Sequence, residues 1–123
     1  MHHNKTNQQH PLTAEAITKL LKHVATHSNV VIRYGKSDMI LQIHSNASCL
    51  SEPKARSRAG GHFYLSNKNL PSHNGPIHTK SSIMKNVMSS TAKTESGAVF
   101  INCHECEPIC TALFEMGHNQ LST

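Results

Sequence analysis

The first part of the chain repeats apolar residues at the spacing of one helix face. The repeat consists of Ala14, Ile17, Leu20, Leu21 and Val24. Intervals of three or four residues return a side chain to the same side of an α-helix. The pattern therefore predicts an amphipathic helix over residues 13–27, with Thr13 as its N-cap. Residues 1–12 are mainly polar and show no such period, which predicts a disordered tail.

Four segments after this helix have the composition of β-strands. The string VVIRY at 30–34 is rich in β-branched residues, and residues 39–46 are apolar until they reach a group of turn formers. Two further candidates are HFYLS at 62–66 and PIHTK at 76–80. Between them and the earlier strands, SEPKARSRA at 51–59 predicts a basic loop.

A second helix is expected after the serines at 89 and 90. The spacing predicts that it packs through an apolar seam formed by Val99, Cys103, Cys106, Cys110 and Leu113. Pro108 lies inside this pattern and predicts a kink or a restart, because its ring removes a backbone hydrogen bond. Gly117 predicts the C-terminal end of the helix.

Composition narrows the classes of function. The chain has 123 residues, which is enough for one small domain, and its acidic residues are six Glu and a single Asp, Asp38. So few aspartates argue against an active site built on several of them. The formal net charge of +5 favours a polyanionic partner such as nucleic acid.

Targeting signals are not apparent in the sequence. It has no long apolar run of the kind that spans a membrane, and its N-terminal residues lack the apolar core of a signal peptide. We expect an intracellular protein, cytoplasmic or nuclear, that is not secreted and has no membrane partner.

The string CHECEPIC raises thiolate metal binding as a candidate function. Cys103, Cys106 and Cys110 are closely spaced, and thiolates are ligands for zinc and for iron–sulfur clusters. On a helix, however, the three cysteines fall on the apolar seam, where a free cysteine packs as a small apolar residue. A second C-x2-C pair, which would complete a tetrahedral site, is missing from the sequence.

Three strings resemble the ribonuclease H domain at the end of copia-type LTR retrotransposon polyproteins. They are SDMILQIHSNASCLSEPKARSRAGGHFYLS at 37–66, NGPIHTK at 74–80 and MSSTAKTESGAVF at 88–100. The resemblance extends from Thr13 to Gly117. Its first helix and strand resemble the stretch that leads from the reverse transcriptase into this domain.

The resemblance implies an α+β, ribonuclease H-like fold. In that family the first three strands form an antiparallel meander, and a helix that carries a glutamate packs against the sheet. The family activity is metal-dependent cleavage of the RNA strand in RNA/DNA hybrids. It uses two Mg²⁺ ions, which require a cluster of carboxylate ligands.

Matched residue by residue, the resemblance implies an incomplete catalytic site. The family's first aspartate, at the end of the first strand, corresponds to Asn46 in HSNAS, and a neutral amide cannot supply the charge that holds two cations together. The family's helix glutamate corresponds to Glu95 in SSTAKTE, the remnant Mg²⁺ position. The third carboxylate lies in a strand after the helix, which we expect beyond Thr123. We therefore expect Asn46 and Glu95 to form a degenerate site without bound Mg²⁺.

The basic loop supplies the candidate contacts to nucleic acid. Lys54, Arg56 and Arg58 alternate with small residues, so they could contact successive phosphates. Aromatic residues make up only 4% of the chain, which argues against stacking on single strands.

The sequence as a whole predicts a truncated ribonuclease H domain that is catalytically inactive. We expect a disordered tail at 1–12, a connector helix and strand at 13–36, the partial domain at 37–117 and a second tail at 118–123. The alternatives are a non-catalytic module that binds nucleic acid weakly and a thiolate metal-binding protein.

Overall fold

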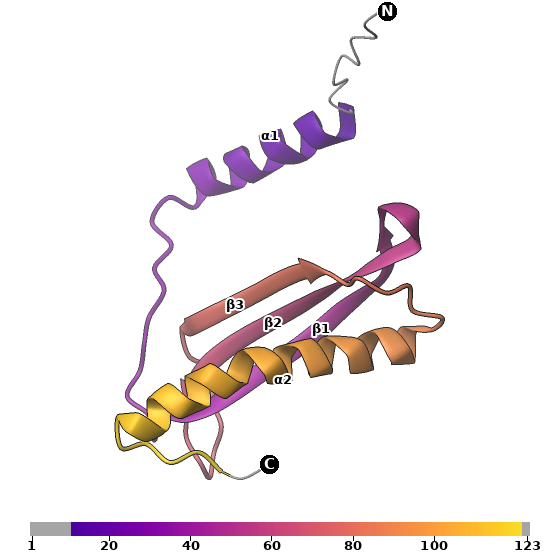
Figure 1. The fold of residues 1–123 in the computed structure, drawn as a ribbon. Coiled ribbons are helices and arrows are strands. Elements are labelled where there is room, and N and C mark those ends of the chain that lie inside the picture. The colour runs from indigo at the N-terminus through magenta and orange to yellow at the C-terminus, as the bar shows by residue number, and fades with distance from the viewer. Residues whose placement is uncertain (1–10, 122–123) are drawn as a thin grey trace, which may run out of the picture. The chain divides into compact units, whose positions relative to one another are not determined.

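The fold is α+β, with a three-stranded antiparallel sheet and two α-helices (Figure 1). The structure is a computed structural model that describes residues 11–121. It divides into two compact units, of which the first ends at Ile32 and the second begins at Arg33. The elements in chain order are α1 (Pro11–Thr26), β1 (Ile40–Glu52), the short 3-10 helix η1 (Pro53–Ala55), β2 (Arg56–Ser66), β3 (Pro76–Ile83) and α2 (Thr91–Glu115).

The first unit consists of the predicted amphipathic helix. α1 begins at Pro11, two residues before the predicted start, so Thr13 lies inside the helix and is not its N-cap. Proline suits a first helical turn because the N–H there has no partner within the helix. Ile17, Leu20, Leu21 and Val24 are all more than half exposed. The predicted tail lies, apart from residues 11 and 12, outside the described residues.

The predicted strand at 30–34 is wrong. These residues form neither strand nor helix, and Val30, Val31 and Ile32 are each more than 60% exposed. A strand needs a neighbour for its backbone groups, and no described strand pairs with this segment. The chain joins the second unit just afterwards, where Tyr34 Oη donates a hydrogen bond to the carbonyl oxygen of Pro76 at 2.7 Å.

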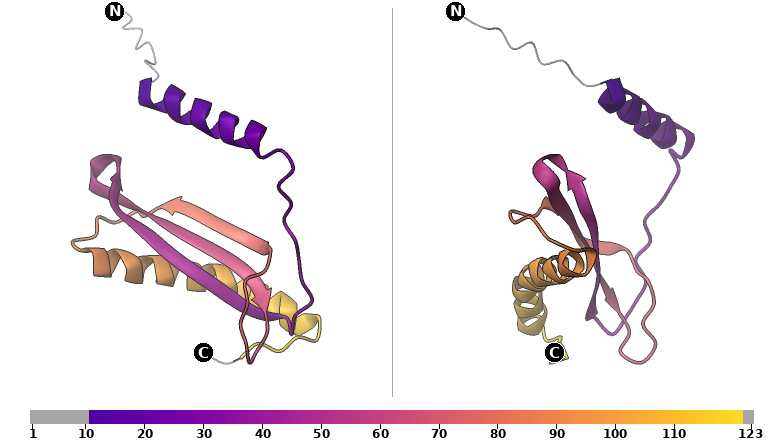
Figure 2. Two further views of the ribbon diagram at one scale, coloured as in Figure 1. Left: turned by 180° about the vertical axis from the view of Figure 1, so that it is seen from behind. Right: turned by 90° about the vertical axis from the view of Figure 1, so that its right-hand side faces the viewer.

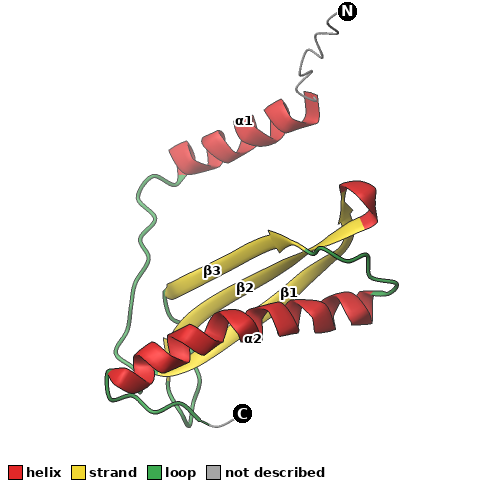
Figure 3. Cartoon of the chain, viewed as in Figure 1, coloured by secondary structure: helices red, strands yellow, loops and turns green. Residues whose placement is uncertain are grey.

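The sheet is a meander in which β2 lies between β1 and β3 (Figure 3). Both pairings are antiparallel, and their register places Asn46 opposite Gly60 and Gly60 opposite Ser81. Antiparallel neighbours joined by short connections are the arrangement that sequence order favours. The predicted strands at 39–46, 62–66 and 76–80 are confirmed, and each continues further than its pattern indicates.

The predicted basic loop at 51–59 is in fact the end of a hairpin. β1 continues to Glu52 and β2 begins at Arg56, so only η1 separates the two strands. Leu50, Lys54 and Ala55 have φ angles of 53°, 62° and 55°, in the left-handed region that L-residues rarely adopt. The β1–β2 pairing therefore extends through residues whose composition indicates a loop. A fourth residue with a positive φ, Met39 at 61°, lies just before β1.

α2 lies along one face of the sheet, as two further views show (Figure 2). Ser90 is its N-cap, and its hydroxyl accepts a hydrogen bond from the N–H of Lys93 at 3.3 Å. The helix is continuous from Thr91 to Glu115, so Pro108 does not restart it. Pro108 lies on the exposed side of α2 and lacks only its own backbone N–H, so the other backbone hydrogen bonds of this long helix remain in place.

The face by which α2 packs differs from the predicted seam. Val99 is 49% exposed, Cys103 is exposed, and Cys106 and Cys110 are only half-buried, whereas Leu113 is buried as expected. The other buried residues of α2 are Thr94, Ala98 and Asn102. Three of the four contact positions are thus small or polar, because the β1 and β2 residues beneath them are small and the helix lies close to the sheet.

The core of the second unit is small. Ala59, Met84 and Ala98 form its buried cluster, with Ala47, Met88 and Ile101 partly buried against them. Phe63 is completely buried nearby in β2. The core therefore lies between α2 and one face of the sheet, and α2 does not cover the opposite face (Figure 2).

Candidate functional site

Asn46 lies on the face of the sheet that points away from α2. Its neighbour Ser45 accepts a hydrogen bond from Asn102 of α2, and its other neighbour Ala47 packs against the buried cluster beneath α2. Successive side chains of a strand point to opposite faces. Asn46 is accordingly exposed, and its Oδ1 accepts the N–H of Ala47 at 2.9 Å.

Glu95 lies in the second turn of α2 and is half-buried. Its neighbour Thr94 is buried against β1, where its hydroxyl donates to Cys49 Sγ at 3.4 Å. The carboxylate therefore belongs to the helix side of the sheet, and the amide of Asn46 belongs to the other side. The structure does not bring these two predicted site residues together, and the expected common metal position is not formed.

The described residues contain no other metal centre of the expected kind. Between residues 11 and 121, no three His, Cys, Asp or Glu side chains are placed to hold an ion. Asn46 and Glu95 therefore do not fit the requirement of Mg²⁺ for several oxygen ligands around one point.

The surroundings of Cys106 in α2 favour its neutral thiol. Cys106 Sγ donates to the carbonyl oxygen of Cys103 at 3.0 Å, within the helix itself. Burial raises the pKa of the Cys106 thiol, and the neighbouring thiols Cys110 and Cys103 raise it further. A raised pKa disfavours the thiolate, which is the form that binds metal. The arrangement gives no support to a thiolate metal site.

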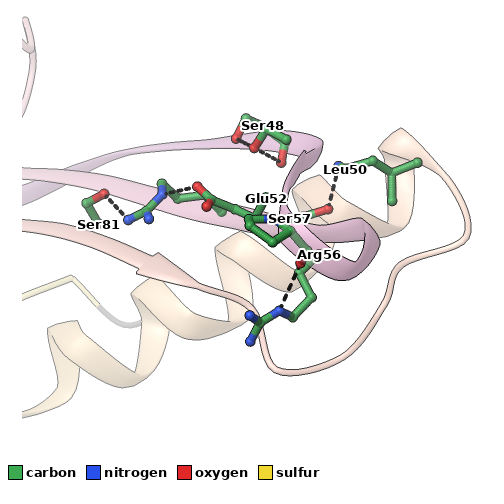
Figure 4. A network of polar contacts seen from close by, with 9 residues as sticks. Ser48, Leu50, Glu52, Arg56, Ser57 and Ser81 are labelled. Atoms are coloured by element: carbon green, nitrogen blue, oxygen red, sulfur yellow. Dashed lines mark hydrogen bonds and ion pairs between the residues drawn. The ribbon is translucent and has the colours of Figure 1, made fainter. Parts of the chain in front are cut away.

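The three predicted phosphate contacts differ in their surroundings. Figure 4 labels one of them, Arg56, together with Glu52 and Ser81. Arg58 Nε lies 2.6 Å from Glu52 Oε1, and its Nη1 donates to Ser81 Oγ at 3.1 Å. Arg56 Nε donates to the carbonyl oxygen of Pro53 at 3.3 Å, which leaves its charge without a carboxylate partner among the described residues. Lys54 is exposed at the tip of the hairpin. Lys54 and Arg56 thus carry the accessible positive charge, and Glu52 offsets that of Arg58.

An aromatic and histidine cluster on the face opposite α2 was not foreseen from the sequence. Tyr64 Oη lies 3.0 Å from His44 Nε2, and Tyr64 is only 4% exposed. The ring centroids of His44 and His73 are 4.6 Å apart, and His62 flanks Tyr64 at 5.4 Å. In the antiparallel register of β1 and β2, the even-numbered residues of both strands point to the same face of the sheet. Positions 44, 62 and 64 are all even, which was the signal in the sequence once this register was known.

A second unforeseen cluster joins α2 to β3. Glu105 Oε1 lies 2.7 Å from Lys80 Nζ, and Glu105 Oε2 lies 3.0 Å from His78 Nε2. The hydrogen bond from Lys80 lowers the pKa of the Glu105 carboxyl, and the bond to His78 lowers it further. This carboxylate holds the helix and the outer strand together and is not free for catalysis.

A groove of about 480 Å³ lies between the end of β3 and α2. Its wall is largely apolar, with Met84, Met88, Phe100 and Ile101 below and Lys80 and Lys85 among the lining residues. It contains neither a nucleophile–base pair nor a carboxylate. The groove has the composition of a binding surface and lacks the groups of a hydrolytic site.

Comparison of the chain with protein-family models, with curated proteins and with solved structures finds no match. Within the described residues, no helix has both the length and the apolar character needed to cross a membrane.

Proposed function

We propose that the chain is a ribonuclease H-like domain of the copia-type retrotransposon kind that does not cleave RNA. The strings at 37–66, 74–80 and 88–100 support the family. The order of an antiparallel meander followed by a helix over one face agrees with the fold that the resemblance implies. The residues of these strings form all three strands and the first part of α2.

The observation that carries the inactive part of the proposal is the neutral amide of Asn46, which stands where the resemblance places an aspartate. Its orientation away from α2 departs from the shared metal position that the resemblance implies, and so weighs against the family itself. Catalysis by two metal ions needs several carboxylates that converge on one point. Asn46 supplies a neutral amide and points away from α2, whereas Glu95 lies on α2. One carboxylate without converging partners does not hold two divalent cations.

The experiment is a cleavage assay on an RNA/DNA hybrid with Mg²⁺ and with Mn²⁺. We expect no cleavage by the purified protein, and we expect none by Asn46→Asp, because the new carboxylate would still face away from Glu95. Glu95→Gln is the matched control, and any background cleavage should be the same in this variant. Metal-dependent cleavage that copurifies with the protein and is lost in Glu95→Gln would overturn the proposal.

The second candidate function is weak binding of nucleic acid through the hairpin tip. The specific observation in its favour is that Lys54 and Arg56 lie together at the exposed end of the β1–β2 hairpin. Such contacts are electrostatic and independent of sequence, so they would suit a duplex or hybrid backbone. The dependence of binding on salt concentration tests this function.

A further inference from the structure

β1 is an edge strand, and side chains of the same chain cap two places along its free edge. Near its start, the N–H of Leu41 donates to Gln120 Oε1 at 2.8 Å, and Gln120 Nε2 donates to the carbonyl oxygen of Met39 at 3.0 Å. Further along, the N–H of Ala47 donates to Asn46 Oδ1. These bonds show which residues turn their backbone groups outward, away from β2.

Within the described part of the second unit, no segment pairs with the outward backbone between the two caps. Hydrogen-bonding direction alternates along an antiparallel strand, so residues of the same parity as Leu41 and Ala47 also face outward. Ile43 and Ser45 are the two residues of that parity between them. Their N–H and C=O groups are the ones that a further strand can pair with.

Along most of its length, this edge lacks the charges and prolines by which proteins often discourage pairing. Residues 40–51 contain no Lys, Arg, Asp, Glu or Pro. The opposite edge strand, β3, begins with Pro76 and carries Lys80. Charges and prolines on an edge strand discourage the addition of another chain. The edge at β3 therefore carries a proline and a charge, whereas the part of the β1 edge between its two caps carries neither.

Apolar surface continues from this edge onto the flank of α2. A cavity of about 180 Å³ beside the start of β1 is lined by Ile40, Leu41, Gln42, Ile43, Cys106, Cys110, Gln120 and Leu121. Val99 and Leu121 are each about half exposed. An added strand would thus gain side-chain contacts on the α2 face as well as backbone hydrogen bonds.

We propose that the free edge of β1 binds β1 of a second copy of this chain, antiparallel and centred on His44. In this register Ile43 pairs with Ser45 of the second copy, and the reciprocal pair repeats the contact. Each pair exchanges two hydrogen bonds. Leu41 lies opposite Ala47 of the second copy, so the backbone N–H groups that side chains already cap face each other. The uncapped N–H and C=O groups of Ile43 and Ser45 form the hydrogen bonds between the copies.

The charge of β1 argues for a second copy as the occupant. The whole chain has a formal net charge of +5, so association through most of its surface would bring like charges together. Within residues 40–51 no formal charge is present, so two copies paired there would place no like charges directly opposite each other. The proposal goes beyond the proposed function, since the dimer needs neither metal nor nucleic acid.

The test uses the two-fold axis, where His44 of each copy lies directly opposite the other. His44 is exposed, so the variants His44→Lys and His44→Glu place like charges across the axis. Sedimentation equilibrium of the wild type should show dimers. Each variant alone should dissociate about fivefold more readily, because directly opposed like charges cost up to about 1 kcal/mol.

An equimolar mixture of His44→Lys and His44→Glu should form heterodimers about tenfold tighter than either variant alone, as native mass spectrometry would detect. Thr79→Lys and Thr79→Glu are the matched controls, since Thr79 is exposed on β3, and neither they nor their mixture should change the association. A wild type that stays monomeric at high concentration overturns the proposal. So does a dimer that the His44 variants and their mixture leave unchanged.

Hydrogen exchange of the wild type gives a test that needs no variant. The amides of Ile43 and Ser45 should exchange slowly at dimer concentrations and faster on dilution, because the dimer contact is their hydrogen-bond partner. Exchange of these two amides that does not change with concentration would contradict the proposed register.

Discussion

Asn102 of α2 donates a hydrogen bond from Nδ2 to Ser45 Oγ of β1, at 2.8 Å across the interface between helix and sheet. The same nitrogen donates to the carbonyl oxygen of Gly60 in β2 at 2.9 Å. Asn102 is only 1% exposed. One buried amide thus joins the helix to two strands, and it fixes which turn of α2 lies over which residues of the sheet.

Asn102→Ala should destabilise the fold by about 2 kcal/mol, because two partly buried acceptors, Ser45 Oγ and the carbonyl oxygen of Gly60, lose their donor. The loss is moderated because Asn102 Oδ1 has no hydrogen-bond partner in the wild type, so its removal relieves a cost. Urea unfolding should show a lower midpoint with an unchanged slope. The control is Ser96→Ala on the exposed side of α2, which should stay within about 0.5 kcal/mol of the wild type. Equal midpoints for the two variants would contradict the assigned role.

Gly61→Ala should be far more damaging than Gly60→Ala, although the two glycines are adjacent. A Cβ at Gly61 would collide with Asn102 Oδ1 and would lie 2.9 Å from a ring carbon of Phe63, whereas a Cβ at Gly60 meets only backbone oxygens at 3.7 and 3.9 Å. We expect a loss of about 3 kcal/mol at Gly61 and a change within about 1 kcal/mol at Gly60. Thermal melts of the two variants check this. A well-folded Gly61→Ala would show that α2 does not lie as close to β2 as described.

Glu105→Gln should lower the melting temperature at neutral pH and have little effect in acid. The pKa of Glu105 is lowered from 4.5 by its hydrogen bonds to Lys80 and His78, so its carboxylate stabilises the folded state above that pH. The contribution is lost as the pH falls from 4.5 through the lowered value, when the folded carboxyl takes up its proton. Melts of wild type and variant should converge in that range. Glu107→Gln, at an exposed position, is the control. If its melting temperature differs from the wild type at neutral pH and converges with it in acid just as that of Glu105→Gln does, the role assigned to Glu105 is refuted.

If the hairpin tip binds nucleic acid, Lys54 and Arg56 should carry more of the affinity than Arg58. Their charges have no carboxylate partner among the described residues, while Glu52 already pairs with Arg58. The double variant Lys54→Ala/Arg56→Ala should reduce the log–log salt slope of duplex binding by about two units, at about 0.9 per phosphate contact. Arg58→Ala removes one charge and should change the slope by well under one unit. A larger effect of Arg58 would reverse the ranking.

The helices, the antiparallel meander and the sheet order were accessible from the sequence, but the contact face of α2 was not. Hydrophobic spacing selects large apolar residues such as Val99, which is half exposed. The actual contacts use Thr94, Ala98 and Asn102, which are small or polar. Such residues pack only because Gly61 and Ser45 beneath them leave room, and this complementarity involves two segments far apart in the chain.

The sequence predicted which elements carry the two candidate site residues. It did not predict the face of the sheet to which Asn46 points. The sequence correctly indicates that Asn46 belongs to the first strand of the sheet and Glu95 to the start of the following helix. Whether a strand residue faces the helix depends on a register of one residue, which a short apolar string does not determine. The pairing of Ser45 with Asn102 sets that register and turns Asn46 to the other face.

The order of the elements also determines how the chain assembles during synthesis. All three strands precede α2, and each pairs with its neighbour in sequence, so the sheet can form while α2 is still within the ribosome. Phe63 and Ala59 then remain uncovered until Ala98 and Leu113 emerge. At roughly 5–20 residues per second, this interval is on the order of seconds. The nascent sheet thus presents its apolar face and the edge of β1 together until α2 packs against it.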